Sequence, residues 1–315
     1  MRNMATGSPM KTVVFAYHDM GLTGLMALKR TGFEIVAIFS HDDDPEENCW
    51  FGSVPAWAKE NGIPLFCPAD VNLPAWRQKI VALAPEVIFS FYYRRLLSPE
   101  ILAAAPGGAF NLHGSLLPRY RGRCPVNWVL VNGEEETGVT LHRMAAKADA
   151  GHILAQKIVP IAFADTAKSL YGKLCHAAVL LLDETLPLIK AGDNPGYPQD
   201  LSAGSYYGGR TPAEGRIDWH WPALRIYNLI RAVTAPYPGA FAFTPQGERM
   251  LIWWGLPEGS DAAGKPGSVV EEGGAVFICA GAGRLRLIDI EINGKRLKNG
   301  EISEYFRQQE GERQL

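Results

Sequence analysis

An amide, an imidazole and a carboxylate occur in this sequence in an order suited to acyl transfer. Asn111 and His113 are separated by one residue, and Asp149 follows them further along the chain. An amide N–H can donate to an oxygen on which negative charge develops. An imidazole can carry a proton near neutral pH because its unperturbed pKa is about 6.5, and a nearby carboxylate favours its protonated form. Together these three groups are sufficient to move an acyl group onto an amine.

The alternation of apolar and polar side chains over residues 109–113 predicts the end of a β-strand. Residues two apart on a strand project to the same side, so Asn111 and His113 are expected to reach one reacting atom. Gly114 and Ser115 then end the strand. Because open α/β folds bind ligands at the carboxyl ends of their strands, the pair is expected to line a binding site.

Each of these residues also has a structural interpretation. A lone Asn-x-His pair is common at hydrogen-bonded strand ends, and Asp149-Ala150-Gly151 has the composition of an ordinary turn. His142 is a competing proton carrier, but its apolar neighbours favour a structural histidine. His18, in the first expected loop, is a minor candidate for a ligand contact.

The chain between residues 11 and 191 alternates short apolar runs with amphipathic stretches, which predicts a Rossmann-like α/β domain with a largely parallel sheet. The first strand is not followed by a G-x-G-x-x-G motif, so a dinucleotide site is not expected. The expected strands are 13–16, 33–39, 64–67, 87–91, 109–112, 139–143 and 153–161. The expected helices are 22–30, 54–60, 76–83, 99–104 and 166–189, the last with Leu170, Leu174, Ala177, Leu181 and Leu188 as its buried stripe.

The pattern changes after residue 191. Residues 192–213 are rich in Gly, Pro, Ser and Tyr without a period, which predicts a linker. A helix at 223–233 followed by strand-like runs at 239–244, 250–254, 268–271, 276–279 and 285–290 predicts a small OB-like β-barrel over residues 214–315. Residues 1–9 are interpreted as a leader or tag remnant, which leaves 10–191 as the N-terminal catalytic domain.

Composition excludes several classes of protein. The chain is 47% hydrophobic and 20% charged with a net charge of −2 and has no long basic run, so nucleic acid is not an expected partner. It contains no apolar segment of membrane length and no signal peptide pattern, which predicts a cytoplasmic location without membrane insertion. The five scattered cysteines lack the spacing of a disulfide scaffold or a metal site, so no metal is expected. None of these features indicates the oligomeric state.

The chain resembles the folate-dependent formyltransferases over most of its length. The signature of that family is Asn-x-His with a distant Asp-x-Gly, which residues 111–113 and 149–151 match. Residues 110–122 and 136–144 are similar to the branch that formylates amino sugars and initiator methionyl-tRNA. Residues 13–21 and 89–94 most resemble the formyltransferase domain that modifies UDP-4-amino-4-deoxy-L-arabinose, here without the decarboxylase domain that can accompany it.

This resemblance implies a 10-formyltetrahydrofolate-dependent N-formyltransferase with Asn111, His113 and Asp149 as catalytic residues. The folate is implied to lie beside two loops, formed by Arg95, Leu96 and Leu97 and by Ala145, Ala146, Lys147, Ala148 and Asp149. Arg123 is implied to face the folate or the acceptor. Arg123 and Arg210 are the candidates for binding the acceptor phosphates, because arginine pairs well with phosphate oxygens.

The implied acceptor is a UDP-linked 4-amino sugar, as in the modification of lipid A that confers polymyxin resistance. The alternatives are methionyl-tRNA, a dTDP-linked amino sugar, and a binding protein that retains the fold without turnover. Methionyl-tRNA is disfavoured because carboxylates at Asp42, Asp43, Asp44, Glu46 and Glu47 would repel tRNA phosphates. The intact catalytic residues disfavour a binding protein without turnover.

Overall fold

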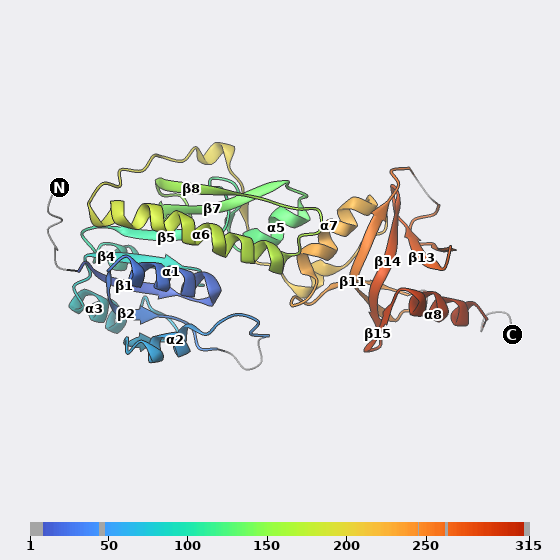
Figure 1. The fold of residues 1–315 in the computed structure, drawn as a ribbon, viewed down its shortest axis with the longest axis horizontal. Coiled ribbons are helices and arrows are strands. Elements are labelled where there is room, and N and C mark those ends of the chain that lie inside the picture. Colours follow the sequence, from blue (N-terminus) through green and yellow to red (C-terminus); the bar gives the residue numbers. More distant parts are fainter. Residues whose placement is uncertain (1–8, 44–47, 245, 262–263, 312–315) are drawn as a thin grey trace. The chain divides into compact units, whose positions relative to one another are not determined.

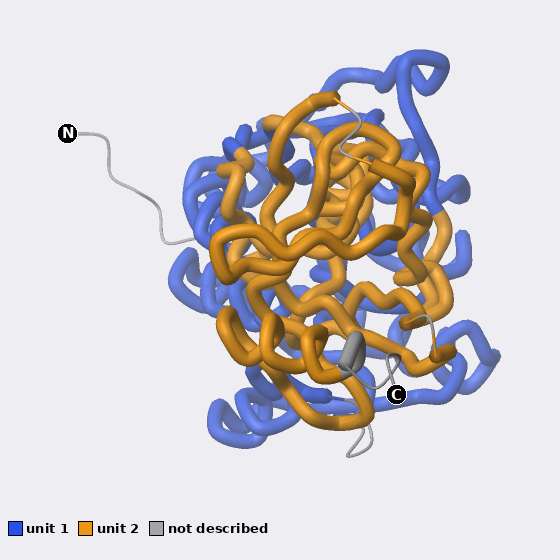
Figure 2. Tube along the Cα trace, turned by 90° about the vertical axis from the view of Figure 1, so that its right-hand side faces the viewer, with its two compact units in different colours: residues 1–125, 136–160, 172–207 blue, residues 126–135, 161–171, 208–315 orange. Residues whose placement is uncertain are grey.

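The computed structural model describes residues 9–43, 48–244, 246–261 and 264–311. The chain divides into two compact units (Figure 2). Unit 1 comprises residues 1–125, 136–160 and 172–207, and unit 2 comprises residues 126–135, 161–171 and 208–315. Of the expected leader, residues 1–8 lie outside the described residues.

Unit 1 is built on a seven-stranded sheet of order β3-β2-β1-β4-β5-β7-β8 (Figure 1). Strands β1 and β4 are almost completely buried, as expected for a sheet covered on both faces. The first five strands in this order pair in parallel, and β7 and β8 extend the sheet in antiparallel pairing. The expected α/β class with a largely parallel sheet is confirmed. The strands are β1 (Lys11–Ala16), β2 (Glu34–Phe39), β3 (Leu65–Phe66), β4 (Val87–Phe91), β5 (Ala109–His113), β7 (Glu136–Arg143) and β8 (Ile153–Pro160).

Helix α1 (His18–Arg30) and most of α6 (Ala167–Lys190) lie on the same face of this sheet (Figure 1). Arg30 on α1 donates a hydrogen bond of 2.5 Å to the Asp183 carboxylate on α6. A Cβ at Gly24 would lie 2.2 Å from the ring of Phe91, so this glycine allows α1 to approach β4 closely. The remaining helices of unit 1 are α2 (Val54–Glu60), α3 (Pro74–Ala82) and α4 (Pro99–Leu102).

The buried face of α6 differs from the expected one at a single position. Four of the five predicted stripe residues are buried, but Leu188 is 48% exposed, so its assignment to the core was wrong. Thr185 and Ile189, four and eight residues after Leu181, are buried instead. Side chains four apart share a helix face, so Ile189 takes the inward position at this end.

Unit 2 consists of an antiparallel sheet of order β10-β11-β14-β13-β12, with β15 paired to β14 and helix α7 packed on it. The expected second domain of β structure after the α/β domain is confirmed, and its sheet is antiparallel. Its elements are α7 (Ala223–Val233), β10 (Ala240–Phe243), β11 (Arg249–Glu258), β12 (Val269–Glu272), β13 (Ala275–Cys279), β14 (Arg284–Ile292), β15 (Lys295–Lys298) and α8 (Gly300–Gly311), together with most of α5 (Pro125–Val131).

The stretch predicted as a linker contains regular structure. It includes the 3₁₀ turns η1 (Leu201–Ala203) and η2 (Pro212–Gly215) and the short strand β9 (Tyr206–Tyr207). Strand β9 pairs in parallel with β6 (Arg121–Gly122), which lies beyond the Asn-x-His motif. Within the described ranges, the helices include none with the length and apolar character needed to span a membrane.

Candidate active site

The Asn-x-His pair lies at the carboxyl end of β5, as expected. Asn111 is half-buried and His113 is 7% exposed. The antiparallel neighbour β7 places His142 directly opposite Asn111 and Thr140 directly opposite His113. Residues from two strands therefore meet around the pair.

Asp149 reaches the same place from the turn between β7 and β8. Its Oδ1 lies 3.6 Å from Nδ1 of His113, and both side chains are largely buried. Its Oδ2 accepts a hydrogen bond of 2.9 Å from the backbone N–H of Gly122. The structure thus brings together the three residues that the sequence singled out.

The ring of His142 also lies in this cluster, although the sequence favoured a purely structural role for it. Its Nε2 lies 3.1 Å from the amide nitrogen of Asn111 and 3.6 Å from Oδ1 of Asp149. Its Nδ1 faces the backbone oxygen of Arg143 at 2.8 Å. A hydrogen on Nδ1 can therefore bond to the Arg143 carbonyl while Nε2 accepts from Asn111, which fixes the orientation of the Asn111 amide.

The environment of Asp149 favours its charged form. Burial acts against the charge, but the positive charge on His113, the facing ring of His142 and the N–H of Gly122 outweigh it. These partners hold the pKa of the Asp149 carboxyl well below its usual range. A carboxylate that stays ionised beside an imidazole stabilises the protonated ring.

The backbone of Tyr120 determines which nitrogen of His113 can accept a proton. Nε2 of His113 lies 2.8 Å from the carbonyl oxygen of Tyr120, and a carbonyl can only accept, so Nε2 carries a hydrogen. In the neutral ring Nδ1 is then the basic nitrogen, and it is the one that faces Asp149. The site can take up a proton at Nδ1 and stabilise the resulting charge.

Gly114 follows His113 at a point of close approach. A Cβ on this residue would lie 2.6 Å from the hydroxyl oxygen of Tyr92, which follows β4. Tyr92 has a positive φ of 59°, a conformation that residues with a Cβ adopt rarely. The glycine of the motif therefore lets two strand ends of the parallel sheet meet beside the site.

His18 lies at the start of α1 in an aromatic environment. Its ring stacks on Phe51 with centroids 3.7 Å apart and meets Trp50 edge to face at 4.7 Å. Burial, reinforced by the charge of Arg94, lowers the pKa of His18 to about 3. The ring is therefore uncharged at neutral pH, and it forms part of an aromatic cluster with Phe51 and Trp50.

The loops expected to contact folate differ in exposure. Leu97 is buried in a hydrophobic cluster of unit 1, on which Met144 also packs, so the second loop begins near the first. Leu96 is 68% exposed, and its carbonyl accepts a hydrogen bond from Asn72. Arg95 and the three residues Ala145, Ala146 and Lys147 are exposed, and Ala148 is half-buried.

Three arginines that follow the Asn-x-His motif in the sequence have different surroundings. Arg123 is exposed, and its backbone N–H donates to Tyr207. Arg210 belongs to unit 2, where its guanidinium lies over the ring of Trp128 at 4.5 Å. Arg121 is 7% exposed, and its Nε and Nη1 have no hydrogen-bond acceptor within the described residues. No sequence pattern marks Arg121 as a candidate.

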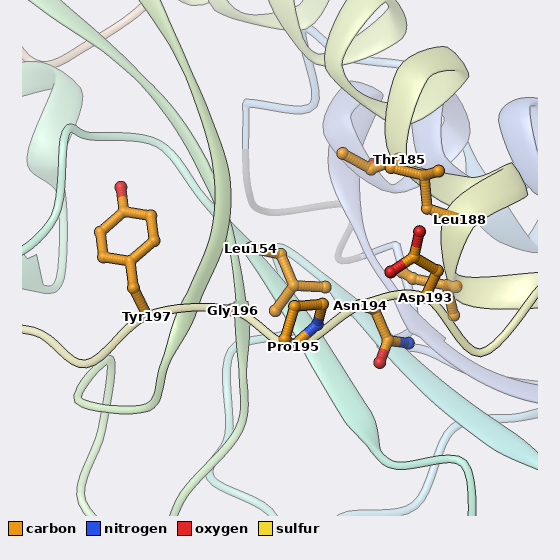
Figure 3. A pocket seen from close by; sticks show the side chains of 9 residues that line it. Leu154, Thr185, Leu188, Asp193, Asn194, Pro195, Gly196 and Tyr197 are labelled. Atoms are coloured by element: carbon orange, nitrogen blue, oxygen red, sulfur yellow. The ribbon is translucent and has the colours of Figure 1, made fainter.

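A separate cavity of about 330 Å³ lies in unit 1 (Figure 3). It is lined by Leu154 of β8, by Thr185, Leu188 and Ile189 of α6, and by residues 193–197. Its lining includes none of Asn111, His113 and Asp149. The exposed Leu188 on α6 contributes to this cavity. Tyr197 lies at the end of the lining loop formed by residues 193–197 (Figure 3).

The described part of the chain contains no group of three or more His, Cys, Asp or Glu side chains placed to hold a metal ion.

Three contributors to the site were missed or set aside by sequence reasoning. His142 could have been found if the antiparallel pairing of β5 with β7 had been known, because this register places it opposite Asn111. The Tyr120 carbonyl and the Gly122 N–H are backbone groups, so no side-chain pattern marks them.

The chain thus combines an α/β unit that carries this polar cluster at the end of β5 with a second unit built on an antiparallel sheet. Residues 10–186 match the family model described as formyl transferase, and residues 210–309 match its C-terminal domain. The chain belongs to the formyl transferase family, and the expected enzyme class is confirmed.

Solved structures with the same fold include two sugar-modifying enzymes. The N-formyltransferase from Helicobacter canadensis, in complex with folinic acid and dTDP-3-aminofucose, has a TM-score of 0.71 at 20% identity and covers 88% of this chain and 99% of its own. WlaRD, a sugar 3N-formyl transferase solved with dTDP and 5-N-formyl-THF, has a TM-score of 0.69 at 19% identity and covers 92% and 100%. HypX from Aquifex aeolicus in complex with tetrahydrofolic acid has a TM-score of 0.62 at 19% identity and covers 94% and 47%.

Proposed function

We propose that this enzyme transfers a formyl group from 10-formyltetrahydrofolate to the amine of a nucleotide-linked amino sugar. The observation that carries the proposal is the meeting of Asn111, His113 and Asp149 at the end of β5 in a chain of the formyl transferase family. The folate and nucleotide-sugar ligands of the Helicobacter canadensis enzyme support the donor and the acceptor class.

In the proposed reaction the amine nitrogen of the acceptor attacks the formyl carbon. A new carbon–nitrogen bond forms, and the bond from the formyl carbon to the folate nitrogen breaks. Asn111 donates its second amide N–H to the formyl oxygen as negative charge develops on it. Loss of such a donor typically costs roughly 2.7–4 kcal/mol of transition-state stabilisation.

Proton transfer is assigned to His113. Its Nδ1 takes the proton that the attacking nitrogen loses, and the same group returns a proton to the departing folate nitrogen. The ionised Asp149, 3.6 Å away, stabilises the protonated ring between these steps. The products are a formamide on the sugar and tetrahydrofolate, with no net gain or loss of protons by the enzyme.

The residues proposed to hold the folate are Arg95, Leu96, Leu97, Arg123 and the loop from Ala145 to Asp149. Arg95, Leu96 and the residues from Ala145 to Lys147 are exposed, so these two loops can contact a ligand. Arg123 is exposed directly after β6, so it can bind a carboxylate or phosphate.

Two acceptors remain candidates. The sequence resemblance favours UDP-4-amino-4-deoxy-L-arabinose. The dTDP-3-aminofucose bound to one structural neighbour and the dTDP present with another favour a dTDP-linked amino sugar, and we place this class first. The neighbours offer no support for the expected link to lipid A modification and polymyxin resistance.

An acceptor panel with one common donor tests the proposal. Purified enzyme is incubated with 10-formyltetrahydrofolate and, separately, with dTDP-amino sugars, UDP-4-amino-4-deoxy-L-arabinose and initiator methionyl-tRNA, and a mass increase of one formyl group is measured. We expect turnover of a nucleotide sugar that is lost in His113→Ala. Absence of turnover with every nucleotide sugar would contradict the proposed function.

A further inference from the structure

The segment from Tyr197 to Tyr207, here called the strap, belongs to unit 1 and contacts the chain on both sides of the catalytic cluster, at residues 149–151 and at residues 120–121. It begins where the cavity-lining loop ends. The backbone of Tyr197 exchanges two hydrogen bonds of 2.9 Å with Ile153 at the start of β8. The strap is therefore anchored close to the turn that carries Asp149.

Gln199 of the strap contacts that turn directly. Its Nε2 donates to the carbonyl oxygen of Asp149 at 3.0 Å and to that of Gly151 at 2.6 Å. Asp149 has a positive φ of 52°, which is unfavourable for a residue with a Cβ. On the other side, a Cβ at Gly151 would lie 1.9 Å from the carbonyl oxygen of Arg143, so the turn fits tightly against β7. Gln199 is thus bonded to two carbonyl groups of a strained turn that also packs closely against the end of β7.

Ser205 of the strap contacts the backbone of Tyr120 and Arg121, next to His113. Its Oγ accepts from the N–H of Tyr120 at 2.8 Å, and its carbonyl accepts from Arg121 at 3.0 Å. Gly204 allows this approach, because a Cβ there would lie 2.4 Å from the carbonyl oxygen of Pro118. The Tyr120 carbonyl in turn receives Nε2 of His113.

We infer that the strap is a positioning device for catalysis, in which Gln199 sets the place of the Asp149 carboxylate and Ser205 sets the carbonyl that orients His113. The expected effect of the strap on the reaction rate rests on the proposed function. Neither residue contacts the reacting atoms, and both act through another group. A displacement of about 1 Å in a catalytic group can lower a rate by about a hundredfold, so such positioning is expected to act on the chemical step.

The test compares Gln199→Met, which removes both donated hydrogen bonds at similar volume, with Ser202→Ala. Ser202 lies in the same strap and is exposed, and its side chain bonds to Asp200 rather than to the cluster. We expect Gln199→Met to lower kcat at least tenfold, with the KM of both substrates changed less than twofold. Ser202→Ala should keep the wild-type kcat. Ser205→Ala should lower kcat, and Ser205→Thr should restore most of it.

Two further measurements separate positioning from a general loss of structure. Because Gln199 acts through Asp149, the double variant Gln199→Met/Asp149→Asn should lose no more activity than Asp149→Asn alone. In ¹⁵N-histidine NMR spectra, the titration midpoint of His113 should move in Gln199→Met in the same direction as in Asp149→Asn. The titratable groups placed around His113 in the described structure are Asp149, which is 3.6 Å away, and His142, which lies 3.6 Å from the same oxygen of Asp149.

A wild-type enzyme without turnover would contradict the proposed function, and the NMR comparison would still decide the role of the strap. A Gln199→Met variant with a wild-type kcat, or with an unchanged His113 titration, would overturn the inference. So would fully additive losses in the double variant.

Discussion

Asp149 and His142 are in contact: Oδ1 of the carboxylate lies 3.6 Å from Nε2 of the ring, the same separation that it has from Nδ1 of His113. One carboxylate oxygen is therefore shared by two histidines. Nε2 of His142 also faces the Asn111 amide at 3.1 Å. Asn111, the proposed oxyanion donor, is therefore connected to His113, the proposed proton carrier, through His142 and Asp149.

Removal of the Asn111 or the His113 side chain should nearly abolish activity. We expect Asn111→Ala and His113→Ala each to lower kcat at least a hundredfold, because an oxyanion donor and a general acid–base each contribute about that factor or more. Folate binding, measured by fluorescence titration, should survive in both variants. Near wild-type turnover in either one would remove the proposed mechanism.

Asp149→Asn should change the pH dependence as well as the rate. The neutral amide removes the negative charge that stabilises protonated His113, so a smaller fraction of the ring is protonated at a given pH. If the reaction needs the unprotonated ring, the acidic limb of the kcat profile moves to lower pH while the maximum falls. A lower rate with an unchanged profile would leave Asp149 a structural role only.

The same carboxylate should affect stability in acid. Its pKa in the folded chain lies below the ordinary value of 3.8, so ionised Asp149 stabilises the fold above that pH. This contribution is lost as the pH falls through the folded-state pKa. We expect the stability difference between wild type and Asp149→Asn, measured by urea unfolding, to shrink as the pH is lowered below about 4. A constant difference from pH 7 to the lowest accessible pH would contradict the assigned partners.

The sequence was sufficient for the parts of the site that depend on side-chain type within one segment. The alternation at residues 109–113 placed Asn111 and His113 on one side of a strand end, and the structure confirms that strand. It was not sufficient for groups that a distant segment supplies. The linker prediction for 192–213 rested on the lack of a period, and hydrogen bonds such as those from Gln199 to backbone carbonyls leave no periodic pattern.

The core shows the same difference between local and long-range information. Helical period alone located most of the buried face of α6, but the choice between Leu188 and Ile189 depends on what packs against the end of the helix. In unit 2 the short strand β15 and helix α8 were not predicted, because four residues of mixed polarity in β15 gain their strand pairing only from β14.

His142 should contribute through the orientation of Asn111. His142→Phe keeps a ring in place but removes the acceptor of the Asn111 amide. We expect kcat to fall about three- to tenfold, since an orienting hydrogen bond is worth about 0.5–1.5 kcal/mol. His176→Phe, at an exposed position on α6, is the matched control and should retain the wild-type rate. A loss as large as that of His113→Ala would instead make His142 a proton carrier.

The contact between Gly114 and Tyr92 should appear as an energetic coupling. Gly114→Ala places a Cβ 2.6 Å from the Tyr92 hydroxyl, and such overpacking costs about 1–3 kcal/mol of stability. Tyr92→Phe removes the clashing oxygen, so the double variant should be more stable than Gly114→Ala alone. Thermal unfolding of the four proteins gives the coupling. Purely additive effects would show that another contact restricts Gly114.

The acidic residues after β2 should prevent the enzyme from using tRNA as an acceptor. Asp42, Asp43, Asp44, Glu46 and Glu47 follow one another closely in the sequence, although 44–47 lie outside the described residues. Attraction between proteins and nucleic acid is strongest at low salt, where screening is weakest, so a chain able to use tRNA should do so under those conditions. We expect negligible formylation of methionyl-tRNA at low salt and turnover of a nucleotide sugar, whose two phosphates need only one or two cationic partners such as Arg123. Neutralising the five carboxylates to amides should raise the affinity for tRNA, measured by filter binding, without lowering turnover of the sugar. Efficient formylation of tRNA by the unmodified chain, with no activity on any nucleotide sugar, would reassign the acceptor to tRNA and leave the roles of Asn111, His113 and Asp149 unchanged.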